Sequence, residues 1–154
     1  MTIPNQTSPE YPLLKFYQLI SGPADQDRPW DEIQSLFLPK ARLRMEVVEE
    51  NGVARSVEWS VEEFAREAAE HYRQAGFWEK EIAHKTDRFG NIAHIFSTYE
   101  SRVGDPQSPP VARGINSVQV VNREGRWQIA SIVFQVERPT TPIPEKYLLP
   151  GDIS

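Results

Sequence analysis

Residues 113–137 read RGINSVQVVNREGRWQIASIVFQVE and predict two adjacent β-strands joined by a tight turn. Before the turn, Val118 and Val120 alternate with polar residues, which is the period of a strand that buries one face. Glu124-Gly125 supplies the turn, and a strand rich in apolar residues returns from it. We therefore expect strands at 111–122 and 127–137.

A second pair of strands precedes this one. The preceding segment also alternates with a period of two, and Gly90-Asn91 provides its turn. A loop that contains three prolines, 104–110, separates the two pairs. The expected strands are 77–87 and 92–103, so the second half of the chain forms four long antiparallel strands.

The first half of the chain is mainly helical. A stripe with helical spacing consists of Leu13, Phe16, Tyr17 and Ile20. A short second helix is expected at 29–37, where it ends before Pro39. Asn51-Gly52 then marks a hairpin, because both residues tolerate positive φ.

The third helix carries the clearest local signals and is expected from Val61 to about Ala75. Ser60 and Glu63 form a capping box, in which each residue satisfies a free backbone donor of the other. Trp59 and Phe64 occupy the positions of a hydrophobic staple. Three acidic residues lie near the helix start, where the helix dipole favours negative charge.

Helices followed by a run of antiparallel strands indicate an α+β fold, with three N-terminal helices packed on a strongly curved antiparallel sheet. The 154 residues suit one domain. Prolines break strands and helix interiors, so their positions delimit the ordered body. The expected divisions are a disordered or extended start at 1–10, a domain at 11–138 and a proline-rich tail at 139–154.

Composition excludes several classes of protein. The chain has 22 acidic and 17 basic residues, and this net negative charge argues against nucleic-acid binding. It has no cysteine, which excludes disulfides and a cysteine nucleophile. No apolar run is long enough for a membrane span, and the start lacks the features of a signal peptide. We expect a cytoplasmic protein with neither a nucleic-acid nor a membrane partner.

Three segments resemble the nuclear transport factor 2-like superfamily, which includes the polyketide-cyclase-like (SnoaL-like) proteins. They are WDEIQSLFLPKARL (30–43), FGNIAHIFSTYES (89–101) and residues 113–137 quoted above. The resemblance covers about 11–138 and implies a cystatin-like cone with a cavity between sheet and helices. It also implies a homodimer through the outer face of the sheet. It does not fix a reaction, because this fold serves enzymes, binding modules and transport adaptors.

The turn at Gly90-Asn91 predicts which strand residues face the cavity. If the turn has two residues, His84 opposes Ser97 and Ile82 opposes Tyr99. With one face of the sheet buried, these residues and Ile95 point inward, as does Asn116 of the next strand. A one-residue slip would reverse the assignment. Further walls of this apolar pocket are Phe16, Trp30 and Phe134.

His84, Tyr99 and Asn116 are the candidate catalytic residues. An imidazole titrates near neutral pH and serves as acid or base. Tyr99 would donate a hydrogen bond to a developing enolate or carbonyl oxygen, and Asn116 would orient it. The alternative is that these groups only bond one another within the core.

The predicted inward set contains no carboxylate, whereas steroid isomerases and cyclases of the superfamily place one in the cavity. The related dehydratases pair histidine with aspartate. A slip in register would turn Glu81 and Glu100 inward and supply a carboxylate. The three histidines are too scattered for a metal site, so we expect no metal and no cofactor.

Two functions remain open at this point. The first is a small-molecule-binding cone with an unknown apolar ligand, and its enzyme form would be an isomerase, cyclase or dehydratase acting on a hydrophobic carbonyl compound. The alternative is a non-catalytic homodimeric interaction module with a packed interior. The two differ in whether the cone holds an open cavity.

Overall fold

The computed structural model describes residues 2–150. Three helices, six strands and one short 3-10 helix follow one another along this part of the chain. In chain order they are α1 (Tyr11–Ile20), α2 (Trp30–Ser35), β1 (Phe37–Val48), β2 (Ala54–Ser60), α3 (Val61–Gln74), β3 (Phe77–Phe89), β4 (Ile92–Val103), β5 (Ala112–Arg123), β6 (Arg126–Val136) and η1 (Glu145–Tyr147). No helix among these residues is both long and apolar enough to cross a membrane.

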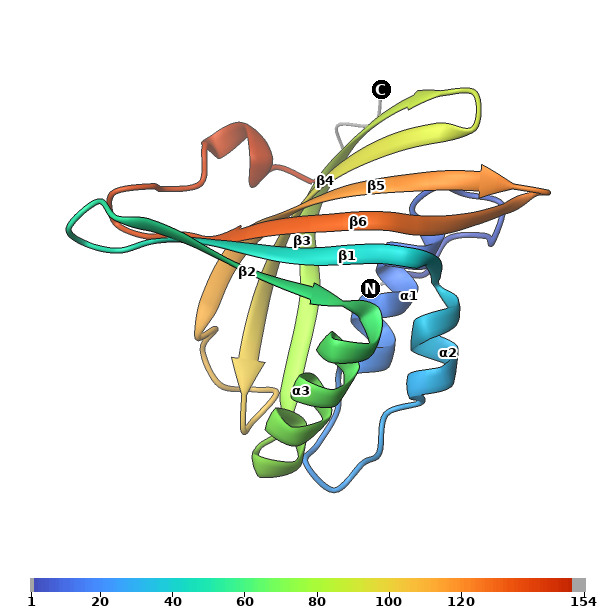
Figure 1. The fold of residues 1–154 in the computed structure, drawn as a ribbon. Helices are drawn as coiled ribbons and strands as arrows, with labels where there is room; N and C mark the ends of the chain where they lie inside the picture. Colours follow the sequence, from blue (N-terminus) through green and yellow to red (C-terminus); the bar gives the residue numbers. More distant parts are fainter. Residues whose placement is uncertain (1, 151–154) are drawn as a thin grey trace.

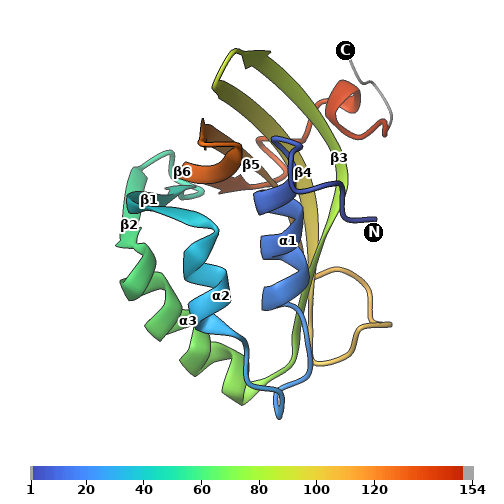
Figure 2. The ribbon, with the colours of Figure 1, turned by 90° about the vertical axis from the view of Figure 1, so that its right-hand side faces the viewer.

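The six strands form one strongly curved sheet in the order β2-β1-β6-β5-β4-β3. Every neighbouring pair is antiparallel except β1 and β6, which run parallel. The three helices lie together on the concave side of the sheet (Figures 1 and 2). The α+β class, with helices on one face of a curved sheet, is therefore confirmed.

The start of β1 differs from the prediction. Helix α2 ends at Ser35, and Phe37 and Pro39 belong to β1 rather than to the helix and its stop. Proline has no N–H to donate, so it is tolerated only where a strand lacks regular pairing. Such a place exists here, because the pairing of β1 with β6 is irregular between Phe37 and Arg42.

The predicted start of α3 is confirmed in detail. The Ser60 hydroxyl accepts a hydrogen bond from the Glu63 backbone N–H at 3.0 Å, and the Glu63 carboxylate accepts one from the Ser60 N–H at 2.9 Å. Trp59 and Phe64 meet edge to face, with ring centres 6.5 Å apart. These local contacts set the direction in which α3 crosses the concave face.

A bulge in β3 decides which side chains face the interior. From the Gly90-Asn91 turn down to Ala83, the pairing of β3 with β4 follows the prediction, and His84 opposes Ser97. Ile82 is then left over, and Glu81 opposes Tyr99. The predicted pairing of Ile82 with Tyr99 is therefore wrong, because an extra residue in one strand reverses the faces beyond it.

The hydrophobic core lies between α1 and the concave face of the sheet. The side chains of α1 that pack there are almost completely buried, and so are those of β4, β5 and β6 beneath them. Its largest fully buried members are Leu13, Tyr17, Ile20, Ile33, Leu43, Ile95 and Ile129. This half of the cone is therefore filled by α1.

Gly114 in β5 makes room for the ring of Tyr99. The pairing of β5 with β4 is regular at this glycine. A Cβ atom at position 114 would collide with the Tyr99 hydroxyl and lie 2.6 Å from the backbone oxygen of Gln135. The glycine therefore lets the Tyr99 ring lie across β5.

Gly114→Ala is expected to lower the free energy of unfolding by about 2–3 kcal/mol, since overpacking of a well-packed site costs this much. Urea denaturation measures the change. In a Tyr99→Ala background, which removes both the ring and its hydroxyl, the same substitution should cost less, and an equal cost in both backgrounds would contradict the predicted collision with Tyr99.

The C-terminal tail folds back onto the outer face of the sheet (Figure 1). The Thr98 hydroxyl donates a hydrogen bond to the backbone oxygen of Tyr147 at 2.6 Å, and the Tyr147 ring packs on Phe96. The turn into this segment is held by Glu137, which accepts hydrogen bonds from Arg113 and from the Ile143 N–H. The tail thus covers part of the face through which the homodimer is expected, and that homodimer stays a prediction.

Candidate functional site

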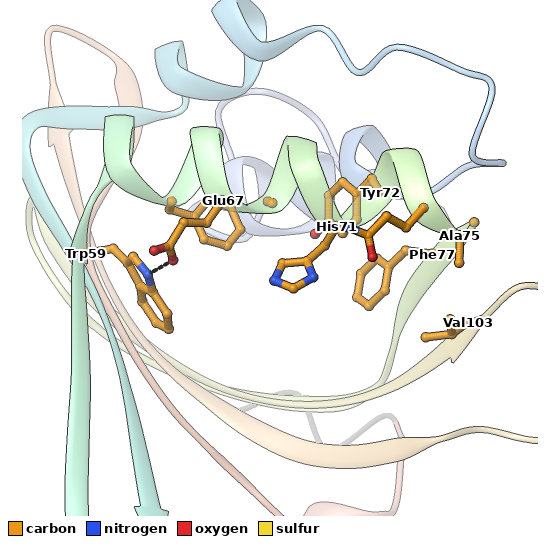
Figure 3. A pocket seen from close by; sticks show the side chains of 11 residues that line it. Trp59, Glu67, His71, Tyr72, Ala75, Phe77 and Val103 are labelled. Carbon is orange, nitrogen blue, oxygen red and sulfur yellow. Dashed lines mark hydrogen bonds between the residues drawn. The ribbon is translucent and has the colours of Figure 1, made fainter.

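An apolar hollow lies between α3 and the concave face of the sheet (Figure 3). Its volume is about 480 Å³. Glu67, His71 and Gln74 of α3 stand along it, and Glu67 accepts a hydrogen bond from the Trp59 indole N–H. The other lining residues are Trp59, Phe64, Ala68, Tyr72, Ala75, Gly76, Phe77 and Val103. An apolar hollow of this size suits a small organic molecule.

Two stacks of aromatic rings bound the hollow. Tyr72 is stacked with Phe77, with ring centres 4.9 Å apart, and also with Trp30 at 6.1 Å. At the other end, Trp59 stacks on Phe134 of β6, with ring centres 6.4 Å apart. Such aromatic pairs contribute about 0.5–1.5 kcal/mol each beyond the burial of their surface, so these contacts help to hold the walls in place.

Arg28 fixes the position of Tyr72. The buried guanidinium lies over the Tyr72 ring, 4.8 Å from its centre. All its N–H groups point to backbone oxygens, and four of the acceptors, on Ile20, Gly22, Pro23 and Gln26, lie at 2.6–3.0 Å. Burial lowers the pKa of Arg28. This arginine therefore ties the loop after α1 to the aromatic wall of the hollow.

Glu79 is the carboxylate that the sequence analysis did not place in the interior. Below the bulge it shares the concave face with Glu81 and opposes Ser101, which is buried. Tyr17, Tyr72 and Tyr99 surround it closely enough to interact with its charge. Burial raises its pKa to about 8. A carboxyl group with such a pKa is part neutral and part ionised near physiological pH.

The Glu79 carboxyl group forms no hydrogen bond within residues 2–150, yet the residue is only partly buried. In that part of the chain, Asn122 Oδ1 is the side-chain oxygen or nitrogen that is both fully buried and without a partner, so the carboxyl oxygens of Glu79 are not fully buried. Glu79 therefore keeps contact with accessible space. It borders a second hollow at the open edge of β3, shared with Gln18 and Ser21, and it does not line the hollow beneath α3, which Tyr72 does.

Tyr99 supplies a hydrogen-bond donor beside Glu79. Its side chain is 4% exposed, and its hydroxyl has no hydrogen-bond partner among the described residues. Burial raises the pKa of Tyr99, and the charge of Glu79 raises it further. The phenol therefore stays protonated over the whole physiological range and retains a proton for a ligand oxygen.

A chain of polar side chains runs beside this acid between α1 and the sheet. Asn116 Nδ2 donates to the Tyr17 hydroxyl at 2.8 Å, and that hydroxyl lies 2.8 Å from the Ser97 hydroxyl. The Ser97 hydroxyl donates to Glu81 at 2.6 Å, and the other oxygen of Glu81 lies 2.6 Å from His84 Nδ1. The structure thus contains a histidine–carboxylate pair with three further groups connected to it.

The Glu81 contact gives stability a specific dependence on pH. The hydrogen bond to Glu81 raises the pKa of His84, and the burial that opposes it is smaller. A raised histidine pKa adds stability that is complete below the unfolded-state value near ~6.5 and is lost as the pH rises through the folded-state value. The pair should therefore stabilise the fold more at pH 6 than at pH 9.

His84→Asn tests this dependence. The loss of unfolding free energy in the variant, measured by urea denaturation, should be larger at pH 6 than at pH 9 by about 1 kcal/mol. Glu79 titrates in both proteins, so its contribution cancels in the difference. An equal loss at the two pH values would contradict the charged contact.

The predicted site residues fall into four groups. His84, Ser97 and Asn116 lie in the polar chain, and Tyr99 faces the same interior. Trp30 and Phe134 lie in the two aromatic stacks, while Phe16 and Ile95 are buried in the core beside α1. Ile82 is the extra residue of the bulge and does not oppose Tyr99.

The statement that no acidic residue faces the interior is wrong. Glu79 and Glu81 face it because of the bulge, whereas Glu100 is bonded to Arg102 at 2.8 Å beside Lys80. Glu81 was expected to face the interior only if the register slipped by one residue. The bulge produces such a slip, but only in the part of β3 that precedes Ile82. Tyr17 was missed as a polar group, because its position in a helical stripe indicates only that it is buried.

Neither a family model nor a curated protein sequence matches this chain. Solved structures do match. A Nostoc punctiforme protein with a cystatin-like fold is 12% identical, with a TM-score of 0.62 over 85% of this chain and 89% of that one. A candidate ketosteroid isomerase from Shewanella frigidimarina is 15% identical, with a TM-score of 0.53 over 86% and 99%. A candidate scytalone dehydratase from Novosphingobium aromaticivorans is 14% identical, with a TM-score of 0.53 over 84% and 81%.

These likenesses establish the fold. The chain has the cystatin-like α+β cone of the nuclear transport factor 2-like proteins, as the resemblance in its sequence implied. The structures that share this cone include isomerase-like and dehydratase-like proteins. At these identities the likeness extends to the fold alone, so the function has to be argued from the site.

Proposed function

We propose that this protein binds a small apolar carbonyl compound and acts on it by acid–base chemistry, as an isomerase, cyclase or dehydratase. The observation that carries the proposal is Glu79, an interior carboxyl group with a pKa of about 8 and no hydrogen-bond partner in residues 2–150. An unpartnered interior acid is costly to keep, so its presence at the hollow that it shares with Gln18 and Ser21 supports use by a ligand.

The first chemical step is removal of a proton from the carbon next to the carbonyl group. The ionised Glu79 carboxylate takes the proton as the C–H bond breaks, and the electron pair moves to the carbonyl oxygen to give an enolate. The Tyr99 hydroxyl donates a hydrogen bond to that oxygen. A carboxylate with a raised pKa is a stronger base than an ordinary one, which favours this step.

The enolate then partitions according to the substrate. Return of the proton from Glu79 to a different carbon gives isomerisation, and departure of a β-hydroxyl group as water gives dehydration. In both outcomes the neutral Glu79 carboxyl group is the proton source. The same two side chains therefore support both reaction types found among the proteins that share this fold.

Exchange of hydrogen for deuterium tests the common step without knowledge of the natural substrate. Ketones with aromatic or fused rings are first screened by thermal shift, since a ligand at ~100 times its Kd stabilises a fold by roughly 2.7 kcal/mol. Compounds that bind are then incubated with the protein in D₂O, and mass spectrometry measures deuterium beside the carbonyl group. Binding together with catalysed exchange is expected. A screen in which no ketone binds, or in which the bound ketones do not exchange, would overturn the proposal.

A further inference from the structure

The polar chain ends at Asn116, which the acid–base step above does not use. Asn116 opposes Ser97 on one side and Phe134 on the other, all on the concave face. Its Nδ2 atom points to Tyr17 of α1. The amide therefore lies between the helix and Phe134, whose ring stacks on Trp59 of the hollow.

The direction of every hydrogen bond in this chain is fixed from one end. Glu81, as a carboxylate, accepts hydrogen bonds and cannot donate them. Ser97 has one hydroxyl proton and gives it to Glu81, so its oxygen must accept from Tyr17. Tyr17 has then used its own proton, and its oxygen must accept from Asn116, which has to present its NH₂ group.

The amide oxygen of Asn116 is consequently turned away from Tyr17. Asn116 Oδ1 has no partner among the described residues, and it is not one of the fully buried atoms there, so it borders accessible space. Tyr99 is its diagonal neighbour, because Tyr99 opposes Gly114 and Ser97 opposes Asn116. The concave face thus offers an acceptor at Asn116 next to a donor at Tyr99.

We propose that Asn116 Oδ1 selects ligands that carry a hydroxyl or N–H group in addition to the carbonyl group, and that Glu81 enforces this choice through Ser97 and Tyr17. The inference rests on the proposed function, because it concerns the ligand of the same interior. A site built to accept a hydrogen bond rejects an analogue that lacks the donor, since the bound analogue shields the amide oxygen from water and leaves it unpaired.

A matched pair of ketones separates the two claims. The probes are 6-hydroxy-2-acetonaphthone and 6-methoxy-2-acetonaphthone, which carry at the same ring position a hydroxyl group that can donate a hydrogen bond and a methoxy group that cannot. Calorimetry at pH 6.5 should give a Kd about tenfold lower for the hydroxyl compound. If both bind equally, the donor selection is overturned and the proposed ligand binding stands. If neither binds, the proposed function and this inference fail together.

Tyr17→Phe tests the role of the chain, because it releases Asn116 while keeping the ring in the core. The preference for the hydroxyl compound should fall from about tenfold to less than about threefold. Tyr11→Phe is the control, since it removes a hydroxyl from the same helix without touching the chain, and its preference should stay unchanged. A Tyr17→Phe protein that keeps the full preference overturns the inference.

Glu81→Gln provides a second test if Tyr17→Phe fails to fold. A glutamine side chain has both donors and an acceptor, so it allows the chain to run in either direction. The preference should again fall below about threefold. An unchanged preference in Glu81→Gln would show that the carboxylate does not set the direction, and it would overturn the inference in the same way.

Discussion

Glu79→Gln is expected to slow deuterium exchange into a bound ketone by at least about 100-fold while changing its Kd by less than about threefold. Glutamine keeps the shape of the side chain but cannot take a proton, and a positioned acid or base contributes roughly 10²–10⁴-fold to such steps. In the wild-type protein the exchange rate should rise with pH and level off above about 8, as Glu79 ionises.

The same substitution should also change how the stability of the protein depends on pH. Because burial raises the folded-state pKa of Glu79 to about 8, the folded protein holds a proton that the unfolded chain releases above its ordinary value. The wild-type protein therefore loses stability as the pH rises from about 5 to about 8. Relative to Glu79→Gln, this loss should be on the order of 3 kcal/mol.

Glu100→Gln is the matched control for both measurements. Glu100 lies on the neighbouring strand but is bonded to Arg102 and faces away from Glu79. Its replacement should leave the exchange rate and the pH dependence of stability as they are in the wild-type protein. If exchange persists in Glu79→Gln at the wild-type rate, Glu79 is not the base in the reaction.

Arg28→Lys is expected to destabilise the protein by about 3 kcal/mol, although it keeps the positive charge. The guanidinium of Arg28 serves at least four backbone oxygens at once, whereas an ammonium group has three protons on one atom and cannot span them. Each buried acceptor left without a partner costs about 1–3 kcal/mol. For a chain of this length the melting temperature should fall by roughly 6–12 °C.

Arg73→Lys is the control for this change. Arg73 is an exposed residue of α3 whose ion pair is with Glu70, and surface substitutions of this kind usually change stability by less than about 0.5 kcal/mol. Because Arg28 also holds Tyr72, the lysine variant should bind ring ketones more weakly at a temperature where it is folded. A variant as stable as the wild-type protein would contradict the bonding described for Arg28.

The sequence analysis predicted the fold because the fold depends on local patterns. Alternation of polar and apolar residues located β3 to β6 within a few residues, and the Ser60–Glu63 box located the start of α3. The parallel pairing of β1 with β6 was beyond such reasoning, because it joins segments about 90 residues apart. No local pattern encodes contacts at that separation.

The inward-facing residues of β3 were predicted only on the turn side of the bulge. The two-residue turn correctly predicted that His84 opposes Ser97. Beyond that point the strict alternation of the two faces fails, because Ile82 has no partner in β4. For that reason Glu79 was not predicted to face the interior. Its raised pKa could not be foreseen either, because it arises from burial, and the three tyrosines close to its charge come from α1, α3 and β4 and meet only in the folded protein.

The central claim is that Glu79 is a partly protonated acid in the interior. Carbon-13 NMR of the protein labelled at glutamate side chains follows each carboxyl group through a pH titration, and the signal missing from Glu79→Gln identifies the resonance. Titration of Glu79 with a midpoint near 8 is the predicted result. A midpoint near the ordinary glutamate value of ~4.3 would contradict the account.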